Sequence, residues 1–368
     1  MNDIAIPASI LPADGRFGSG PSRIRSAQVD VLAAVGSTLL GTSHRQRPVR
    51  ALVERVQQGL LDLFNAPAGY EVVLGNGGAS AFWDAATFGL IHTRSQHVQA
   101  GEFGAKFAAA AGAAPFLADP QILSADPGTT RRPEPAEGID AYCWVHNETS
   151  TGVLSPVTRV DDGEALMVVD GTSAAGGVAV DVTQTDAYYF APQKVLGSDG
   201  GLWLALLSPA AIARVEELRS RWVPASLSLG AALDNSRQHQ TTNTPALATL
   251  VLMAEQIDWL LDQGGLEFAG ARTAQSSDLL YQWAAERDYT TPFVADPAHR
   301  SPVVVTIDFD TAIDAAALAG ALRANGIVDV EPYRKLGRNQ LRVGTYPSVD
   351  PDDVGALIAC LDYVVERL

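Results

Sequence analysis

One lysine stands in an unusual place in this chain. The sequence has three lysines, Lys106, Lys194 and Lys335, among its 26 lysine and arginine residues. Lys194 follows the apolar run AYYFAPQ and precedes a glycine-rich turn. A lysine amine can lose its proton and add to a carbonyl group, which an arginine guanidinium in practice does not do. On this stretch alone, a surface lysine at the end of a strand is the alternative.

A carboxylate stands in a comparable place. Asp170 ends the apolar run ALMVVD and is followed by small residues, 24 positions before Lys194. Open α/β sheets place ligand-binding groups at the carboxyl ends of their strands. Two neighbouring strands would therefore bring this carboxylate and the Lys194 amine into one crevice. The alternative for Asp170 by itself is a turn or helix-capping residue.

A third candidate is the stretch GNGGASAFW, residues 75–83, between a predicted strand and a predicted helix. The free N–H groups of such a helix start form an anion cradle. The run is not the GxGxxG dinucleotide pattern, and a plain tight turn is the alternative. A phosphate cradle, a strand-end aspartate and a strand-end lysine are together what pyridoxal phosphate needs. The lysine holds the aldehyde as a Schiff base, and the aspartate keeps the ring nitrogen protonated.

The elements that position these residues alternate between helices and strands. The apolar spacing predicts helices over residues 26–40 and 48–64, and a strand, a turn and a helix over 71–90. Strands are predicted at 97–100, 141–147, 165–170, 187–193 and 201–207. This alternation is typical of an α/β fold, a mostly parallel sheet with helices on both faces.

The pattern changes after residue 245. Residues 245–286 read as a long helical region, followed by strands at 301–309 and 339–346 with a helix at 314–326 between them. A last helix begins with Asp350 as N-cap and Pro351 at its first position. We expect a lead-in over residues 1–15 that packs with the small domain, a large domain over 16–260 and a small α+β domain over 261–368.

Composition excludes several classes of function. The net charge of −16 and the pI of about 4.7 disfavour a nucleic acid or an anionic membrane as partner. The two cysteines form no Cys/His cluster, so we predict neither a metal site nor a disulfide framework. The N-terminus lacks the features of a signal peptide, and no long apolar stretch predicts a membrane span. We therefore expect a cytoplasmic protein whose tryptophans lie in the core.

Taken in order, the motifs resemble those of the phosphoserine aminotransferases, which belong to the class V group of fold-type I pyridoxal-phosphate enzymes. They are most similar to the actinobacterial branch. The resemblance runs nearly end to end, through FGSGPS, GTSHRQRPV, GNGGASAFWDAA, HNETSTGV, DAYYFAPQK, DGGLWLA, NTPA and EPYRKLGRNQLRV. It implies a homodimer with shared active sites. The reaction would convert 3-phosphohydroxypyruvate and L-glutamate into O-phospho-L-serine and 2-oxoglutarate, a step of serine synthesis.

The resemblance also assigns roles around the cofactor. Lys194 would be the Schiff-base lysine and Asp170 the partner of the pyridine nitrogen. Thr149 would hydrogen-bond the ring hydroxyl. Phe103 would stack on the ring, where many relatives have a tryptophan.

The cofactor phosphate would be held from two subunits. Ala79 and Ser80 would offer backbone N–H groups to it, with help from Gln193. Asn243 and Thr244 match a motif that reaches the phosphate from the neighbouring subunit.

Two short basic stretches, GTSHRQRPVR and YRKLGRNQLR, contain no acid in an otherwise acidic protein. A solvated basic surface is the alternative, but a substrate with a phosphate and a carboxylate needs two anion sites, which arginine forks suit. By resemblance, Arg342 would bind the α-carboxylate. His44 and Arg45 of the partner subunit would join Arg334 around the distal phosphate or the glutamate side chain. Relatives often carry a histidine at the position of Tyr333.

Three rivals remain at this point. One is another class V transaminase of the alanine–glyoxylate type, and one is a cysteine desulfurase. A desulfurase needs a reactive cysteine on a mobile loop, whereas Cys143 lies in an apolar strand and Cys360 in a helix. The third is a non-catalytic binding protein on the same fold. The pairing of Lys194 with Asp170 argues against it.

Overall fold

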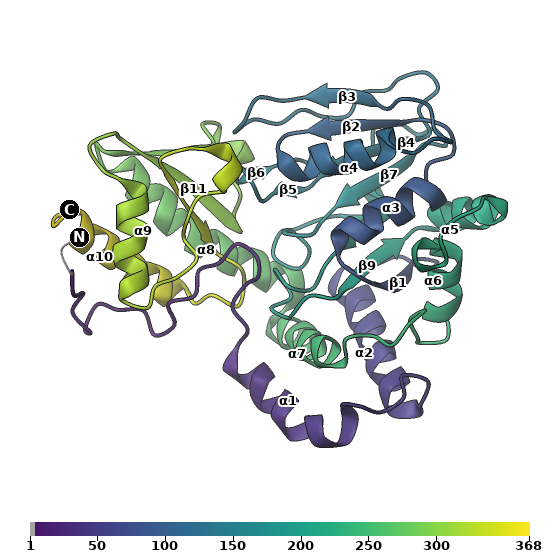
Figure 1. Cartoon of the computed structure of the whole chain (residues 1–368), viewed down its shortest axis with the longest axis horizontal. Coiled ribbons are helices and arrows are strands. Elements are labelled where there is room, and N and C mark those ends of the chain that lie inside the picture. The colour runs from purple at the N-terminus through teal and green to yellow at the C-terminus, as the bar shows by residue number, and fades with distance from the viewer. Residues whose placement is uncertain (1–3) are drawn as a thin grey trace.

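The computed structural model describes residues 4–368 and has two lobes (Figure 1). The larger lobe is built on a seven-stranded sheet. Its order is β1 (Glu71–Asn76), β9 (Leu202–Leu207), β8 (Ala187–Phe190), β7 (Leu166–Asp170), β4 (Ala141–Val145), β2 (Ser95–Gln99) and β3 (Gln121–Ser124). Six of the strands run in the same direction, and β9, which lies between β1 and β8, runs in the opposite direction. The predicted α/β fold with a mostly parallel sheet is confirmed.

Helices cover both faces of this sheet, because successive strand residues point to opposite sides. Val72 and Leu74 enter one hydrophobic core, and Val73 enters the other. The first core is covered by α1 (Ser26–Leu39), α2 (Arg47–Leu63) and α7 (Leu247–Gln263). The second is covered by α3 (Ala79–Gly89), α4 (Glu102–Gly112), α5 (Pro209–Glu217) and α6 (Leu229–Ser236). With both faces buried, the strands are nearly continuous apolar runs.

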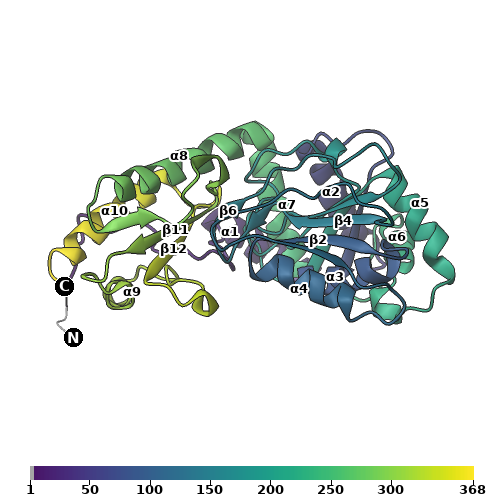
Figure 2. The same cartoon turned by 90° about the horizontal axis from the view of Figure 1, so that it is seen from above.

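The second lobe has its own antiparallel sheet of β10 (Thr290–Pro292), β11 (Val304–Phe309) and β12 (Gln340–Gly344). The helices α8 (Gly265–Ala285), α9 (Ala315–Ala324) and α10 (Pro351–Val365) complete it, as Figure 2 shows from above. Helix α8 joins the lobes, because Ala269 lies in the first core and Leu280 in that of the second lobe. Ile6 and Phe17, near the N-terminus, also lie in the second-lobe core.

The domain boundaries at residues 15 and 260 stay predictions, and residues 1–3 of the lead-in lie outside the described residues. Within residues 4–368, no helix is long and apolar enough to cross a membrane.

The structure differs from the sequence analysis in local details. The helical region after residue 245 is broken at Gly264 and Gly265, whose φ angles of 118° and 68° favour glycine. The short strands β3 and β10 lie at the edges of their sheets and were not predicted. Trp222 was expected in the core, but 78% of it is exposed.

We predict that Gly75→Ala destabilises the larger lobe. Gly75 pairs with Trp203 across β1 and β9, and a Cβ at Gly75 would lie 2.1 Å from the indole ring. Overpacking of this kind costs about 1–3 kcal/mol, measurable as a lower midpoint in urea unfolding. The control is Gly320→Ala in α9, where a Cβ meets nothing within 4 Å. It should be neutral or stabilising by up to about 1 kcal/mol. Equal midpoints for both variants would contradict the packing of Trp203 on Gly75.

Candidate active site

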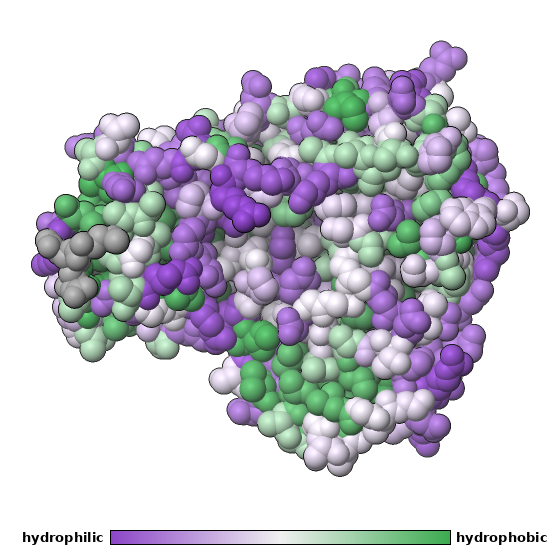
Figure 3. Space-filling view, in the orientation of Figure 1, coloured by the Kyte–Doolittle hydropathy of each residue, from purple (hydrophilic) through white to green (hydrophobic). Residues whose placement is uncertain are grey.

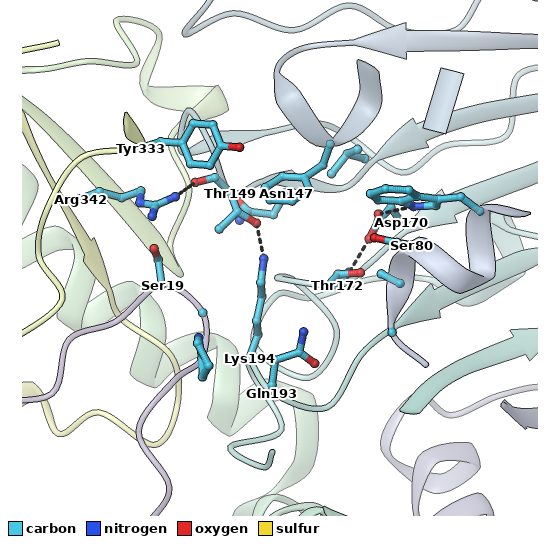
Figure 4. Close-up of a pocket in the computed structure, with 17 residues that line it drawn as sticks. Ser19, Ser80, Asn147, Thr149, Asp170, Thr172, Gln193, Lys194, Tyr333 and Arg342 are labelled. Carbon is cyan, nitrogen blue, oxygen red and sulfur yellow. Dashed lines mark hydrogen bonds between the residues drawn. The ribbon is translucent and has the colours of Figure 1, made fainter. Parts of the chain in front are cut away.

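A cavity of about 380 Å³ lies at the carboxyl ends of the central strands, with walls from both lobes (Figure 4). Of the predicted site residues, it brings together Ala79, Ser80, Phe103, Thr149, Asp170, Gln193, Lys194 and Arg342. Asp170 is the last residue of β7, and Lys194 follows β8. Because β7 and β8 are parallel neighbours, their ends meet at one edge of the sheet.

The Lys194 side chain extends into this cavity and is only 8% exposed (Figure 4). Its Nζ donates a hydrogen bond to Thr149 Oγ1 at 2.7 Å and lies 5.0 Å from the centre of the Phe103 ring. Burial lowers the pKa of Lys194 to about 8, and the negative charge of Asp170 opposes this shift. The turn at Gly20 packs so closely that a Cβ there would lie 2.8 Å from Lys194 Cε. Glycine is therefore needed at that position of FGSGPS.

The Asp170 carboxylate is also buried, at 3% exposure. Its Oδ1 accepts a hydrogen bond from the Thr172 N–H at 2.8 Å, and Oδ2 accepts one from Trp83 Nε1 at 3.4 Å. Burial raises the pKa of Asp170, while the hydrogen bond from the Thr172 N–H and the charge of Lys194 lower it. Trp83 lies in the hydrophobic core, as expected, and its indole also lines the cavity beside this carboxylate.

The start of α3 forms one end of the cavity. Gly78 caps the helix without a side-chain hydrogen bond, so N–H groups of the first turn, which contains Ala79 and Ser80, are available to a ligand. A Cβ at Gly78 would meet nothing within 4 Å, which leaves open space beside these groups. Two lining side-chain atoms, Thr172 Oγ1 and Gln193 Oε1, are buried without a hydrogen-bond partner in residues 4–368. Buried polar groups left this way point to a bound ligand.

Arg342 reaches the cavity from β12 in the second lobe. Its Nη1 donates to the Thr149 carbonyl at 2.9 Å, and its Nε is buried without a partner in the described part of the chain. Burial lowers the pKa of this guanidinium. The Tyr333 ring lies 5.4 Å from the Arg342 guanidinium carbon and 6.3 Å from the Phe103 ring. These contacts close the cavity on the side of the second lobe.

The remaining predicted residues do not line the cavity. His44 Nδ1 lies 3.2 Å from Thr244 Oγ1, and the Asn243 N–H donates to Asn76 Oδ1 at 3.2 Å. Arg45 is exposed on the loop before α2. Arg334 is exposed in the short helix η5 (Arg334–Leu336) that follows Tyr333. These five residues therefore lie outside the cavity of their own chain.

Sequence reasoning missed several residues of the site. Asn147 and Glu148 stand in HNETSTGV directly before Thr149, and Thr172 stands two positions after Asp170. Asn147 Oδ1 lines the cavity and is buried without a partner in the described chain. The HNETSTGV motif was a usable signal for Asn147 and Glu148, and the nearness of Thr172 to Asp170 was a usable signal for Thr172. No sequence pattern predicts that the Trp83 indole N–H reaches Asp170.

A model of the aminotransferase class-V family matches residues 23–329. A putative phosphoserine aminotransferase of Mycolicibacterium vanbaalenii is 61% identical over 100% of this chain and 99% of its own length. A phosphoserine aminotransferase of Nocardioides sp. is 58% identical over 99% of both chains. In fold, the crystal structure of a phosphoserine aminotransferase from Cytophaga hutchinsonii has a TM-score of 0.86 at 20% identity, covering 95% of this chain and 99% of that one. The chain therefore belongs to the class-V aminotransferase family, in its phosphoserine aminotransferase branch, as the sequence motifs predicted.

Proposed function

We propose that this chain is a pyridoxal-phosphate-dependent phosphoserine aminotransferase of the cytoplasm. It transfers the amino group of L-glutamate to 3-phosphohydroxypyruvate and forms O-phospho-L-serine and 2-oxoglutarate for L-serine biosynthesis. One observation carries the proposal: a buried lysine with a lowered pKa and a buried aspartate share a single cavity with a helix start and an arginine.

The residues fit the cofactor. The cavity of about 380 Å³ is within the usual range of small-molecule sites, about 300–1,000 Å³. The N–H groups of Ala79 and Ser80 suit the phosphate, and Gln193 and Thr172 bring buried polar atoms without partners in residues 4–368. The apolar face of Phe103 suits an aromatic ring.

When bound, pyridoxal phosphate supplies a carbonyl carbon for the amino group and a ring that withdraws electrons from the Cα–H bond. Lys194 Nζ would remove the proton from the Cα of the amino acid as general base and, once protonated, would donate it as general acid. The Thr149 hydroxyl orients Nζ, and with a pKa of about 8 Lys194 is partly neutral near neutral pH. The Asp170 carboxylate holds a proton on the ring nitrogen, since a nearby negative charge favours the protonated form.

Substrate binding is assigned to the arginines. Arg342 takes the α-carboxylate common to all amino and keto acids, because its guanidinium is partly buried in the cavity wall and its buried Nε has no partner in the described chain. Together with Tyr333 it lines the side of the cavity formed by the second lobe. Arg334, with His44 and Arg45 of a second subunit, takes the distal phosphate or carboxylate.

We further propose a homodimer with shared sites. Helix α1 is largely apolar, yet only Gln28 is buried in it. Val29 is 49% exposed and Leu40, just after the helix, 43%. Figure 3 shows an apolar patch over α1. A surface of this kind on one chain marks an interaction site. A second copy on this face accounts for the patch and for His44, Arg45, Asn243 and Thr244 lying outside the cavity of their own chain.

A cysteine desulfurase is not supported, since it needs an accessible thiolate. Cys143 is 1% exposed and Cys360 is fully buried. Burial raises the pKa of Cys143 well above its usual value and that of Cys360 to about 11.

Lys194→Arg should keep the fold and the charge but lower the transamination rate by at least about a hundredfold, because arginine cannot exchange the proton. The rate is measured with glutamate and 3-phosphohydroxypyruvate. The matched control is Lys106→Arg on the surface of α4, where 46% of the lysine side chain is exposed; it should retain wild-type activity. Turnover near the wild-type rate in Lys194→Arg would remove this residue from the mechanism.

Uptake of pyridoxal phosphate by the cofactor-free protein should depend on the Lys194 titration. Below its pKa of about 8 the amine is mostly protonated and cannot attack a carbonyl. The uptake rate should therefore rise by about tenfold per pH unit up to that value and level off above it. Stopped-flow absorbance from pH 6 to about pH 9.5 measures this profile. A rate independent of pH would contradict a buried amine with a lowered pKa.

Arg45→Ala should lower kcat/KM for 3-phosphohydroxypyruvate and glutamate by about 10- to 150-fold but spare alanine and pyruvate, which lack a distal anion.

Mixing the Arg45→Ala variant with the Lys194→Ala variant tests whether the two subunits share each site. A mixed dimer has both lesions in one site and none in the other, so a random equal mixture should regain about a quarter of wild-type activity. No recovery despite proven subunit exchange would place Arg45 outside the partner's site.

A further inference from the structure

Glu148 is a buried acid with no role in the proposed chemistry. It is 0% exposed and lies in β5 (Asn147–Glu148), beside the cavity but not among its lining residues. Its Oε2 accepts hydrogen bonds from the N–H groups of Phe103 at 3.1 Å and Gly104 at 3.2 Å. Its Oε1 accepts from the Ser150 N–H at 3.2 Å and the Ser150 hydroxyl at 2.6 Å. Oε1 also accepts a longer bond from the Phe103 N–H, at 3.4 Å, so the carboxylate joins two different segments of the chain.

One of these segments is the start of α4. Its N-cap, Gly101, supplies no side-chain hydrogen bond, so the N–H groups of the first turn need another acceptor. The Glu148 carboxylate provides it from a different part of the sequence, and negative charge is favourable at a helix N-terminus. The fit is close, because a Cβ at Gly101 would lie 2.6 Å from Glu148 Cγ. Helix α4 is therefore docked on Glu148 at its first turn.

The other segment leads to the reacting amine. Thr149 follows Glu148 directly; its hydroxyl accepts from Lys194 Nζ, and its carbonyl accepts from Arg342. Phe103, the second residue of α4, lies 5.0 Å from the same Nζ. One carboxylate thus fixes the aromatic face of the cavity relative to the segment that holds Lys194 and Arg342.

Glutamine, which has the same shape but no charge, could not fully replace the Glu148 carboxylate. Burial raises the pKa of Glu148, and the hydrogen bonds from Ser150 and Gly104 oppose that shift. Both oxygens act only as acceptors: Oε2 for the Phe103 and Gly104 N–H groups, and Oε1 for the two Ser150 donors and, at 3.4 Å, the Phe103 N–H. A glutamine would turn its NH2 group toward one of these pairs and leave buried donors facing each other.

We propose that Glu148 is a positioning residue, which holds α4 so that Phe103 lies against the cofactor ring. This inference rests on the proposed function, because the ring that Phe103 contacts is that of the proposed cofactor, pyridoxal phosphate. It concerns how the cavity is built and involves no proton transfer by Glu148 itself.

The test is the affinity of the cofactor-free protein for pyridoxal phosphate, measured by quenching of protein fluorescence. Glu148→Gln should raise Kd by at least about tenfold, the expected effect of losing hydrogen bonds to a buried charge. In a Phe103→Ala background the same substitution should change Kd by less than about twofold, because its effect acts through Phe103.

Asp186→Asn is the matched control for lost stability. Asp186 is also buried, at 3% exposure, and accepts from the Met167 N–H, the Ser208 hydroxyl and Arg159. It precedes β8, at the end of the sheet opposite the cavity. This variant should lower the urea midpoint but leave Kd unchanged.

Two results would overturn the proposal: an unchanged Kd in Glu148→Gln, or an equal loss with and without Phe103, which would show a general structural effect. If Glu148→Gln does not fold, Glu148→Asp is measured instead, with and without Phe103→Ala. Its shorter side chain cannot reach both segments, so the same changes in Kd are expected. A wild-type protein that binds no pyridoxal phosphate would contradict the proposed function rather than this inference.

Discussion

The Lys194 amine is buried in the cavity, at 8% exposure, and much of the surrounding structure follows from this constraint. A buried ammonium is poorly solvated, so its pKa falls and it needs polar partners nearby. Thr149 supplies a hydrogen bond and Asp170 supplies negative charge. The same burial that weakens the charged form leaves part of the amine neutral and able to react with a carbonyl.

These partners meet because of the strand order. Strands β4, β7 and β8 are parallel neighbours, so the segments after them end at one edge of the sheet. Asp170 ends β7, Lys194 follows β8, and Thr149 follows β4 after a short connection. The second lobe then adds Arg342, and the N-terminal segment adds Gly20. The site therefore exists only when both lobes are folded together.

The sequence predicted the parts of the site that follow from local patterns. Asp170 and Lys194 each end an apolar, strand-like run, and strand ends are where such sheets bind ligands. Trp83 lies in the core as predicted, but the hydrogen bond from its N–H to Asp170 depends on tertiary packing. The role of Glu148 likewise appears only once α4 is docked beside β5. The basic stretch at His44 and Arg45 indicated an anion site, but within one chain these residues lie outside the cavity.

The Lys194 cavity is expected to hold pyridoxal phosphate and to exchange amino groups on it. The visible absorption spectrum of the purified protein, loaded with pyridoxal phosphate, tests this most directly. We expect a visible band that L-glutamate bleaches and that 3-phosphohydroxypyruvate restores, because each half of the reaction changes the cofactor. A protein without such a band, or a band that alanine bleaches and glutamate leaves unchanged, would contradict the account.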